Sequence, residues 1–230
     1  MNLAVLFGNY SELSSITQNN LRQEAENADK GFMFIFVLNW IIVSFVTSYT
    51  YGEYMLGIVG GGLVTALAFL VYHFFKGQSI SRITIGILIM AFPIIMIQQH
   101  LGRIEMHFHI FVVLAFMSMY KDILPTIAAA LTIAVHHLLF TYLQLNDVVI
   151  GGAKIIVFNY GCGWDIAFLH AAFVIVEAAV LIYMIYMITK QYLDSMEIIK
   201  NVSEITHSND LSIEIKDDTV QGAAFSEFIQ

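Results

Sequence analysis

Long apolar runs separated by short polar segments dominate residues 31–190 of the chain. A helix of about 20 apolar residues is long enough to cross the hydrocarbon core of a bilayer. Six runs of about this length are predicted to be helices, at Gly31–Tyr49, Met55–Phe75, Ile80–Gln99, Ile104–Tyr120, Ile123–Leu143 and Trp164–Thr189. The pattern therefore predicts an all-α fold, a polytopic membrane bundle of about six transmembrane helices, over residues 31–190.

The segments on either side of the runs are polar. Residues 1–30 are predicted to be an N-terminal leader, amphipathic or partly disordered. Residues 191–230 carry apolar residues at helical spacing, namely Leu193, Met196, Ile199 and Val202. A second helix is expected from near Thr219 and is still running at the last residue. This layout predicts a helical tail that relays a signal and continues in a longer natural protein.

Three features predict local details within the runs. Pro93 is expected to kink the third helix, because proline lacks the N–H that the helix needs. The run Gly60-Gly61-Gly62 would allow another helix to approach closely. Asn39, in an otherwise apolar helix, is expected to form an interhelical hydrogen bond.

Composition supports a membrane protein and excludes some other classes. Hydrophobic residues make up 58% of the chain and charged residues only 12%, about half the charge of a typical soluble domain. The ten Lys and Arg residues form no basic cluster, so we expect no nucleic-acid partner. The single cysteine, Cys162, excludes an internal disulfide and a cysteine zinc cage.

The distribution of positive charge predicts the orientation. Six spans put both termini on one side of the membrane, and most positive residues near span ends share that side: Lys30, Lys76, Arg82, Lys121 and Lys190. The opposite side keeps Arg103 and Lys154. By the positive-inside rule, both termini are expected to be cytoplasmic.

Six of the eight histidines are predicted to lie at one depth, near the periplasmic side: His100, His107, His109, His136, His137 and His170. His107 precedes the turn at residues 121–122 by about 14 residues and His136 follows it by about 14, so both rise about 21 Å from it. His73 and His207 lie at the opposite side. Histidines gathered in this way indicate a bound metal ion or a haem.

Helical geometry narrows the choice of ligands. Residues two apart point about 200° apart, so His107 and His109 cannot both reach one ion from a regular helix. His136 and His137 differ by about 100°, so one can bind the ion while the other packs or forms a hydrogen bond. We expect His107, His137 and His170 to be the ligands, with His109 and His136 as replacements.

Three further residues are expected to orient the ligand rings or carry protons: His100, Glu105 and Glu177. Glu105 shares a helix face with His109, and Glu177 shares one with His170. Glu177 falls near mid-membrane, where a carboxylate without a partner costs about 2.5 kcal/mol or more. No catalytic residue is assigned.

Neutral imidazoles suit several transition metals, so the expected ion is Cu, Zn or Fe. Haem b is the alternative cofactor, with His107 or His109 facing His137 or His170 as axial ligands. The structural alternative is a polar network that only fixes the packing of the helices.

A distinctive run, His100-Leu-Gly-Arg-Ile-Glu-Met-His-Phe-His109, opens the fourth predicted helix. Tyr120-Lys-Asp122, His136-His137, Trp164 and His170-Ala-Ala-Phe-Val follow it. The pattern resembles a multi-helix sensory module at the N-terminus of bacterial methyl-accepting chemotaxis proteins, diguanylate cyclases and histidine kinases. The resemblance covers about residues 30–190. Family members often have Asp-Trp where this chain has Asp122-Ile123, so no role attaches to that tryptophan here.

Residues 199–215 resemble the HAMP-type linker of chemotaxis transducers. Together the two resemblances imply a transmembrane receptor that detects a metal, oxygen, nitric oxide or redox state. They also imply a homodimer that acts through a downstream domain on a cytoplasmic chemotaxis kinase and its coupling protein.

An intramembrane metal-dependent hydrolase or oxidase is the alternative of a different class, with Glu105 or Glu177 as general base. A transporter with a proton-linked histidine path is a third interpretation. We favour the sensor, because the tail has the layout of a relay and no substrate-handling domain is evident.

Overall fold

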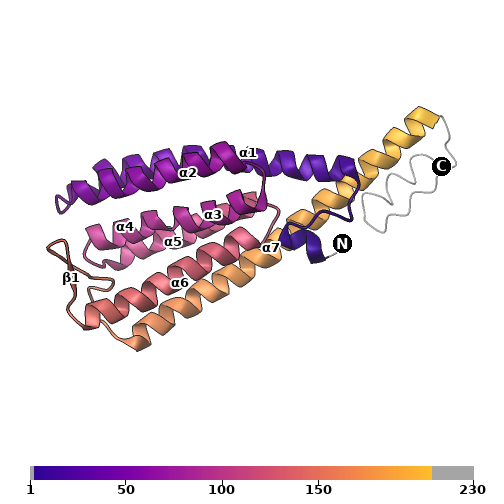
Figure 1. The fold of residues 1–230 in the computed structure, drawn as a ribbon. Coiled ribbons are helices and arrows are strands. Elements are labelled where there is room, and N and C mark those ends of the chain that lie inside the picture. Colours follow the sequence, from indigo (N-terminus) through magenta and orange to yellow (C-terminus); the bar gives the residue numbers. More distant parts are fainter. Residues whose placement is uncertain (1–2, 209–230) are drawn as a thin grey trace.

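The computed structural model describes residues 3–208, which form a helical bundle with a short β-hairpin (Figure 1). The strands β1 (Val149–Ile150) and β2 (Ala153–Lys154) pair antiparallel. The long helices are α1 (Ser15–Ile41), α2 (Gly62–Phe75), α3 (Ser79–Ile89), α4 (Ala91–Gln99), α5 (Ile104–Phe116), α6 (Leu124–Leu145) and α7 (Trp164–Ser208). The predicted all-α fold is confirmed.

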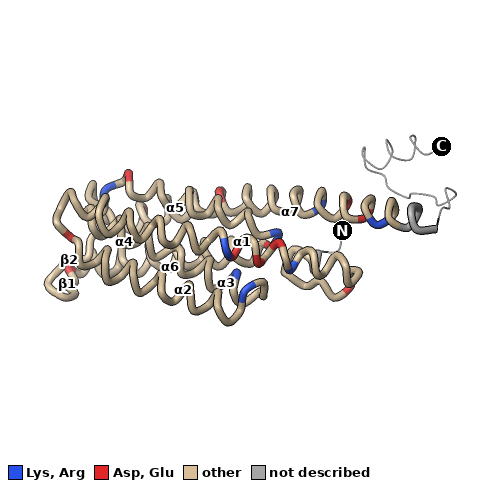
Figure 2. Tube along the Cα trace, turned by 90° about the horizontal axis from the view of Figure 1, so that it is seen from above, with Lys and Arg blue, Asp and Glu red and all other residues tan. Residues whose placement is uncertain are grey.

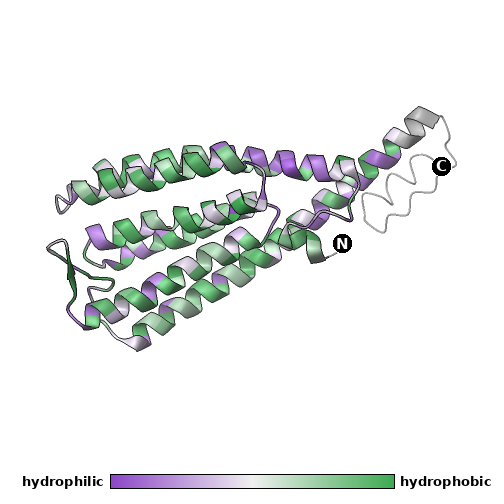
Figure 3. Cartoon of the chain, in the orientation of Figure 1, coloured by the Kyte–Doolittle hydropathy of each residue, from purple (hydrophilic) through white to green (hydrophobic). Residues whose placement is uncertain are grey.

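Within residues 3–208, five helical segments are long and apolar enough to cross a membrane: Ser15–Tyr49, Leu56–Phe75, Ser79–Gln99, Leu124–Leu145 and Trp164–Ser203. Figure 3 shows the apolar residues along them. The fourth predicted run, Ile104–Tyr120, is also helical, but its helix, Ile104–Met119, is shorter than these five. At about 1.5 Å per residue it is about 24 Å long, against about 30 Å for the hydrocarbon core.

Short helical segments extend the long helices. The π-helical turn η2 (Ile42–Val46) and the 3-10 turn η3 (Thr47–Tyr49) follow α1, and the π-helical turn η4 (Leu56–Gly61) precedes α2. The 3-10 turn η5 (Met117–Met119) follows α5, and η1 (Leu3–Phe7) begins the described chain.

The helices run alternately up and down between two ends (Figure 1). We call the end that carries β1 and β2 the strand end, and the end from which α7 projects the tail end. Helix α3 packs between α2 and α6, and α6 packs between α3 and α7. Helix α5 packs against α4, α6 and α7. This arrangement brings α5, α6 and α7 together at the strand end.

Pro93 interrupts the third helical rod. Helix α3 ends at Ile89 and α4 begins at Ala91, with Met90 between them at φ −67° and ψ −13°. Because Pro93 has no N–H to donate to the carbonyl of Ile89, the regular bonding pattern cannot continue there. The predicted kink is confirmed.

Glycines allow the second rod to lie directly on the end of the first. A Cβ on Gly57 would clash with the carbonyl oxygen of Val43. On Gly61 it would lie 2.9 Å from Val43 Cγ2, and on Gly62 it would lie 3.3 Å from the Trp40 ring. The close helix approach predicted from the glycine run is therefore confirmed, and it begins one turn earlier than expected.

The first helix begins well before the first apolar run. Ser14 caps α1 by accepting a hydrogen bond from the backbone N–H of Thr17, and the helix continues without interruption to Ile41. Residues 15–30, which the sequence analysis placed in a leader, are therefore the first turns of α1. Polar residues on this segment meet α7, since Asn20 lies 3.3 Å from Met196 Sδ.

A buried polar network joins the helices at the tail end, where Figure 2 shows many of the charged residues. Asp29 on α1 is fully buried and accepts hydrogen bonds from Tyr120 Oη at 2.7 Å and Ser81 Oγ at 3.0 Å. Arg82 on α3 is 2% exposed and pairs with the buried Asp122 at 2.9 Å. Partnering of this kind offsets the large cost of burying charge.

The turn before α6 is fastened to helices on both sides. Lys121 Nζ pairs with Glu24 on α1 at 2.8 Å and lies 4.6 Å from the centre of the Tyr192 ring on α7. Ile123 packs with Ile185 of α7. The tail end therefore links α1, α6 and α7 into one unit.

Helix α7 carries the expected relay segment out of the bundle as far as Ser208. The rest of the HAMP-like stretch and the second helix expected near Thr219 lie outside the described residues.

Candidate functional site

The structure brings together three of the predicted ligands at the strand end. His107 lies on α5, His137 on α6 and His170 on α7. Their ring centroids are 5.3 Å apart for His107 and His137, 5.3 Å for His107 and His170, and 5.8 Å for His137 and His170. We call these three residues the histidine triad. His107 and His137 are buried, and His170 is half-buried.

Phe158 covers the triad. Its ring stacks on His107 at 5.6 Å with an interplanar angle of 15°, and lies 4.7 Å from His170 and 5.8 Å from His137. Phe158 belongs to the segment between β2 and α7, so a loop residue closes a site that three helices build. An aromatic lid limits the access of water to the rings.

Each triad ring is oriented by its own helix. The Nδ1 atoms lie 3.1 Å from the carbonyl oxygen of Arg103, 3.0 Å from that of Ile133 and 2.9 Å from that of Ile166, each one turn earlier. A carbonyl oxygen only accepts, so Nδ1 carries the hydrogen in all three rings. In the neutral imidazole Nε2 then bears the free lone pair, which is the tautomer that binds a metal through Nε2.

His107 has a buried ring nitrogen that lacks a hydrogen-bond partner among the described residues. The atom is Nε2, and no group within residues 3–208 forms a hydrogen bond with it. A buried acceptor without a partner costs about 1–3 kcal/mol and calls for a specific explanation, such as a bound water or ion.

The spacing of the rings suits a tetrahedral metal ion. With metal–nitrogen distances of about 2.0–2.1 Å, imidazole centroids lie about 5.2 Å from one another, close to the separations in the triad. Within residues 3–208, however, no group of three or more His, Cys, Asp or Glu side chains is already arranged to hold a metal ion. The separations of the rings suit an ion, but their nitrogen atoms do not yet converge on one point. Metal binding therefore requires the rings to turn.

The two replacement ligands face elsewhere. His109 Nε2 donates to Asn39 Oδ1 at 2.7 Å, which ties α5 to α1 and confirms the interhelical bond expected of Asn39. The His136 ring packs 4.1 Å from that of Phe140. His136 Nδ1 lies 3.4 Å from His137 Nδ1, so His136 borders the triad without joining it.

The groups expected to orient the ligands do not contact the triad. His100 ends α4, where its Nδ1 lies 3.2 Å from the carbonyl oxygen of Met96 and its ring meets Tyr51 edge-on. Burial lowers the pKa of His100, which favours the neutral ring. Glu105 pairs with Arg103 at 3.0 Å on the exposed rim of the bundle.

Glu177 lies on α7 two turns beyond His170, about 10 Å along the helix. It is half-buried. Its carboxylate is therefore beyond hydrogen-bond reach of the triad.

Gln144 on α6 holds the lid in place, and sequence reasoning did not identify it. Its Oε1 accepts from the backbone N–H groups of Val157 and Phe158 at 2.7 and 3.1 Å, and its Nε2 donates to the Phe158 carbonyl at 2.7 Å. The side-chain amide of Gln144 thus forms hydrogen bonds with the loop backbone in both directions, as donor and as acceptor.

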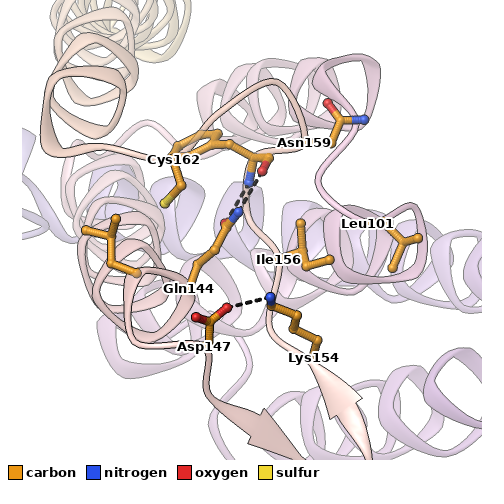
Figure 4. Close-up of a pocket in the computed structure, with 9 residues that line it drawn as sticks. Leu101, Gln144, Asp147, Lys154, Ile156, Asn159 and Cys162 are labelled. Carbon is orange, nitrogen blue, oxygen red and sulfur yellow. Dashed lines mark hydrogen bonds and ion pairs between the residues drawn. The ribbon is translucent and has the colours of Figure 1, made fainter.

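A cavity of about 550 Å³ lies beside this anchored loop. Gln144 and Phe158 line it, together with Asp147, Lys154 and Cys162 (Figure 4). Phe158 therefore both lines this cavity and packs on the triad.

Comparisons with known proteins add no assignment to this site. The chain matches no protein-family model, no curated protein and no solved structure.

Proposed function

We propose that this chain is the membrane-embedded sensor of a bacterial signalling protein, and that it binds a Cu, Zn or Fe ion through His107, His137 and His170. One observation carries the proposal. Three helices deliver three Nδ1-protonated imidazoles at the spacing of a tetrahedral site, and His107 Nε2 is buried there without a partner. A bound ion would give that nitrogen a partner.

In this proposal the triad lies in the periplasmic half of the inner membrane, and both termini are cytoplasmic. The distribution of Lys and Arg supports this orientation, because Lys121 and Lys190 lie toward the tail end. The resemblance to the sensory module of chemotaxis proteins supports the same arrangement.

A metal ion suits the site better than haem b. Axial imidazoles must face each other across a porphyrin. Here Phe158 packs against all three rings at 4.7–5.8 Å and would have to leave before a porphyrin could enter.

A sensor is also better supported than a metal-dependent hydrolase or oxidase. A hydrolase needs a general base within hydrogen-bond reach of the metal-bound water. Glu105 is held on the rim by Arg103, and Glu177 lies two turns from His170. The triad therefore has ligands but no carboxylate beside them.

Helix α7 provides the route to the output. It carries His170 at the strand end and runs without a break to Ser208, through the start of the HAMP-like segment. A change in the position of the His170 ring therefore acts directly on the relay helix. In the proposal a homodimer passes this change through a downstream domain to a chemotaxis kinase and its coupling protein.

The test is the metal content of tag-free protein purified in detergent, measured by elemental analysis together with a visible absorption spectrum. His137→Ala should lose most of the bound metal, because it removes a ligand. His136→Ala is the matched control, since His136 is the adjacent residue and is similarly buried. His73→Ala, at the tail end, is the distant control.

Both controls should retain the metal. Equal metal content in His137→Ala and His136→Ala would show that the histidines form a packing network. A haem Soret band that His137→Ala abolishes would instead support haem b.

A further inference from the structure

The third triad ring already has a partner on its metal-binding nitrogen. Tyr160 Oη lies 3.3 Å from His170 Nε2. Because His170 Nδ1 donates to the carbonyl of Ile166 at 2.9 Å, the neutral ring has its lone pair on Nε2. The phenol is therefore the donor in the bond between Tyr160 and His170.

We propose that Tyr160 is a latch that competes with a metal ion for Nε2 of His170, so that metal binding releases Tyr160 from the site. The inference rests on the proposed function. One lone pair cannot accept a hydrogen bond and coordinate an ion at the same time, so the two states exclude each other. The exchange is noncovalent: the ion gains the nitrogen, and the phenol turns to water.

The chemistry of Tyr160 suits a latch better than a ligand. In the bond to His170 the phenol is the donor, so Tyr160 carries its proton there. A metal ligand would need the phenolate. The side chain is 49% exposed, so water can satisfy the hydroxyl once it leaves His170.

The surrounding loop allows Tyr160 to move while Phe158 stays in place. Gln144 fixes both backbone groups of Phe158, and the Asn159 N–H donates to the Gly102 carbonyl at 3.2 Å. Gly161 follows at φ +123°, a conformation that side-chain-bearing residues rarely adopt. The fixed part of the loop thus ends just before Tyr160.

Two consequences follow for the bound and free states. The hydrogen bond lowers the metal affinity, because it must break before the ion can bind. Metal binding also changes the loop that carries Tyr160, because the side chain is freed from His170, in addition to its effect on α7.

The test measures Zn²⁺ affinity by competition with a chelating dye, using tag-free protein in nanodiscs. Tyr160→Phe should bind zinc about two- to tenfold more tightly than the wild type, the range expected for one lost competing hydrogen bond. Tyr142→Phe is the matched control, because Tyr142 is a similarly exposed tyrosine, at 54%, on α6. It should leave the affinity unchanged.

Hydrogen exchange gives a second readout that a purely structural role would not move. Zinc should increase exchange at residues 160–163 in the wild type. The same residues should exchange faster in metal-free Tyr160→Phe and should not respond to zinc.

The outcomes separate this inference from the function it rests on. Triad-dependent zinc binding that is equal in the wild type and Tyr160→Phe, or weaker in Tyr160→Phe, overturns the latch alone. Weaker binding would make Tyr160 a positioning residue or a ligand. No zinc binding in either protein overturns both the latch and the metal site.

Discussion

Two histidines of α5, His107 and His109, lie two residues apart on different faces of the helix and should respond in different ways to the same substitution. His107 Nε2 is buried without a partner, whereas His109 Nε2 donates to Asn39 at 2.7 Å. His107→Leu therefore removes a buried acceptor that has no partner among the described residues. His109→Leu instead leaves the Asn39 Oδ1 acceptor without its donor. We predict that metal-free His107→Leu is the more stable of the two variants.

The magnitudes follow from the contacts of each ring. His107→Leu relieves a cost of about 1–3 kcal/mol for the unpaired acceptor. It loses the Nδ1 bond to Arg103, worth about 0.5–1.5 kcal/mol, and the stack on Phe158, worth a similar amount. The Arg103 carbonyl keeps the Met106 N–H as a partner at 3.1 Å. The free energy of unfolding should therefore change by less than about 1 kcal/mol.

His109→Leu has no such compensation. It breaks the bond to Asn39, which is 3% exposed, and leaves Oδ1 of that side chain buried without a donor. The other amide group of Asn39 still donates to the Ile35 carbonyl at 2.9 Å, so the side chain cannot simply turn over. The expected loss of stability is about 1–3 kcal/mol.

Unfolding in mixed detergent micelles, with and without zinc, measures both effects. Zinc at about a hundredfold excess over its dissociation constant should stabilise the wild type and His109→Leu by about 2.7 kcal/mol. It should not stabilise His107→Leu, which lacks a ligand. Metal-free His107→Leu that is less stable than His109→Leu would refute the argument from the unpaired nitrogen.

Zinc should be retained at about pH 7.5 and lost as the pH falls below about 6, because imidazoles, with a reference pKa near 6.5, take up protons that compete with the metal. Equilibrium dialysis at several pH values would measure the bound zinc. Zinc binding that is constant down to about pH 5 would contradict histidine ligation. A reporter inserted near Gly152, in the turn between β1 and β2, should be periplasmic, and one fused after Gln230 should be cytoplasmic; finding both on one side would contradict the proposed orientation.

Much of the fold was predictable because it depends on local signals. Apolar runs predicted the helices, Pro93 predicted the break between α3 and α4, and Asn39 predicted an interhelical hydrogen bond. Counting residues from the turn before α6 also placed His107 and His136 at one depth, and with His136 its neighbour His137, because helical rise is fixed. The structure brings those two rings within 5.3 Å of each other.

The rest depended on tertiary placement. A helix pattern cannot decide which of His136 and His137 faces the triad, since the choice depends on how α6 is rotated against its neighbours. Phe158 and Tyr160 lie in a segment without periodicity, and its position depends on tertiary hydrogen bonds to Gln144 and Gly102. The network of Asp29 and its partners joins residues far apart in the chain, which no local pattern connects.

The clamp at Lys121 has a mechanical consequence for α7. From His170 to Tyr192, which lies against Lys121, the helix is about 33 Å long, and about 24 Å remain from there to Ser208. A stiff rod held at that point is a lever with unequal arms. A sideways displacement of 1 Å at His170 becomes, by this ratio, about 0.7 Å in the opposite direction at Ser208. In the proposed sensor, the contacts of the turn before α6 would therefore set both the size and the direction of the movement at the end of α7.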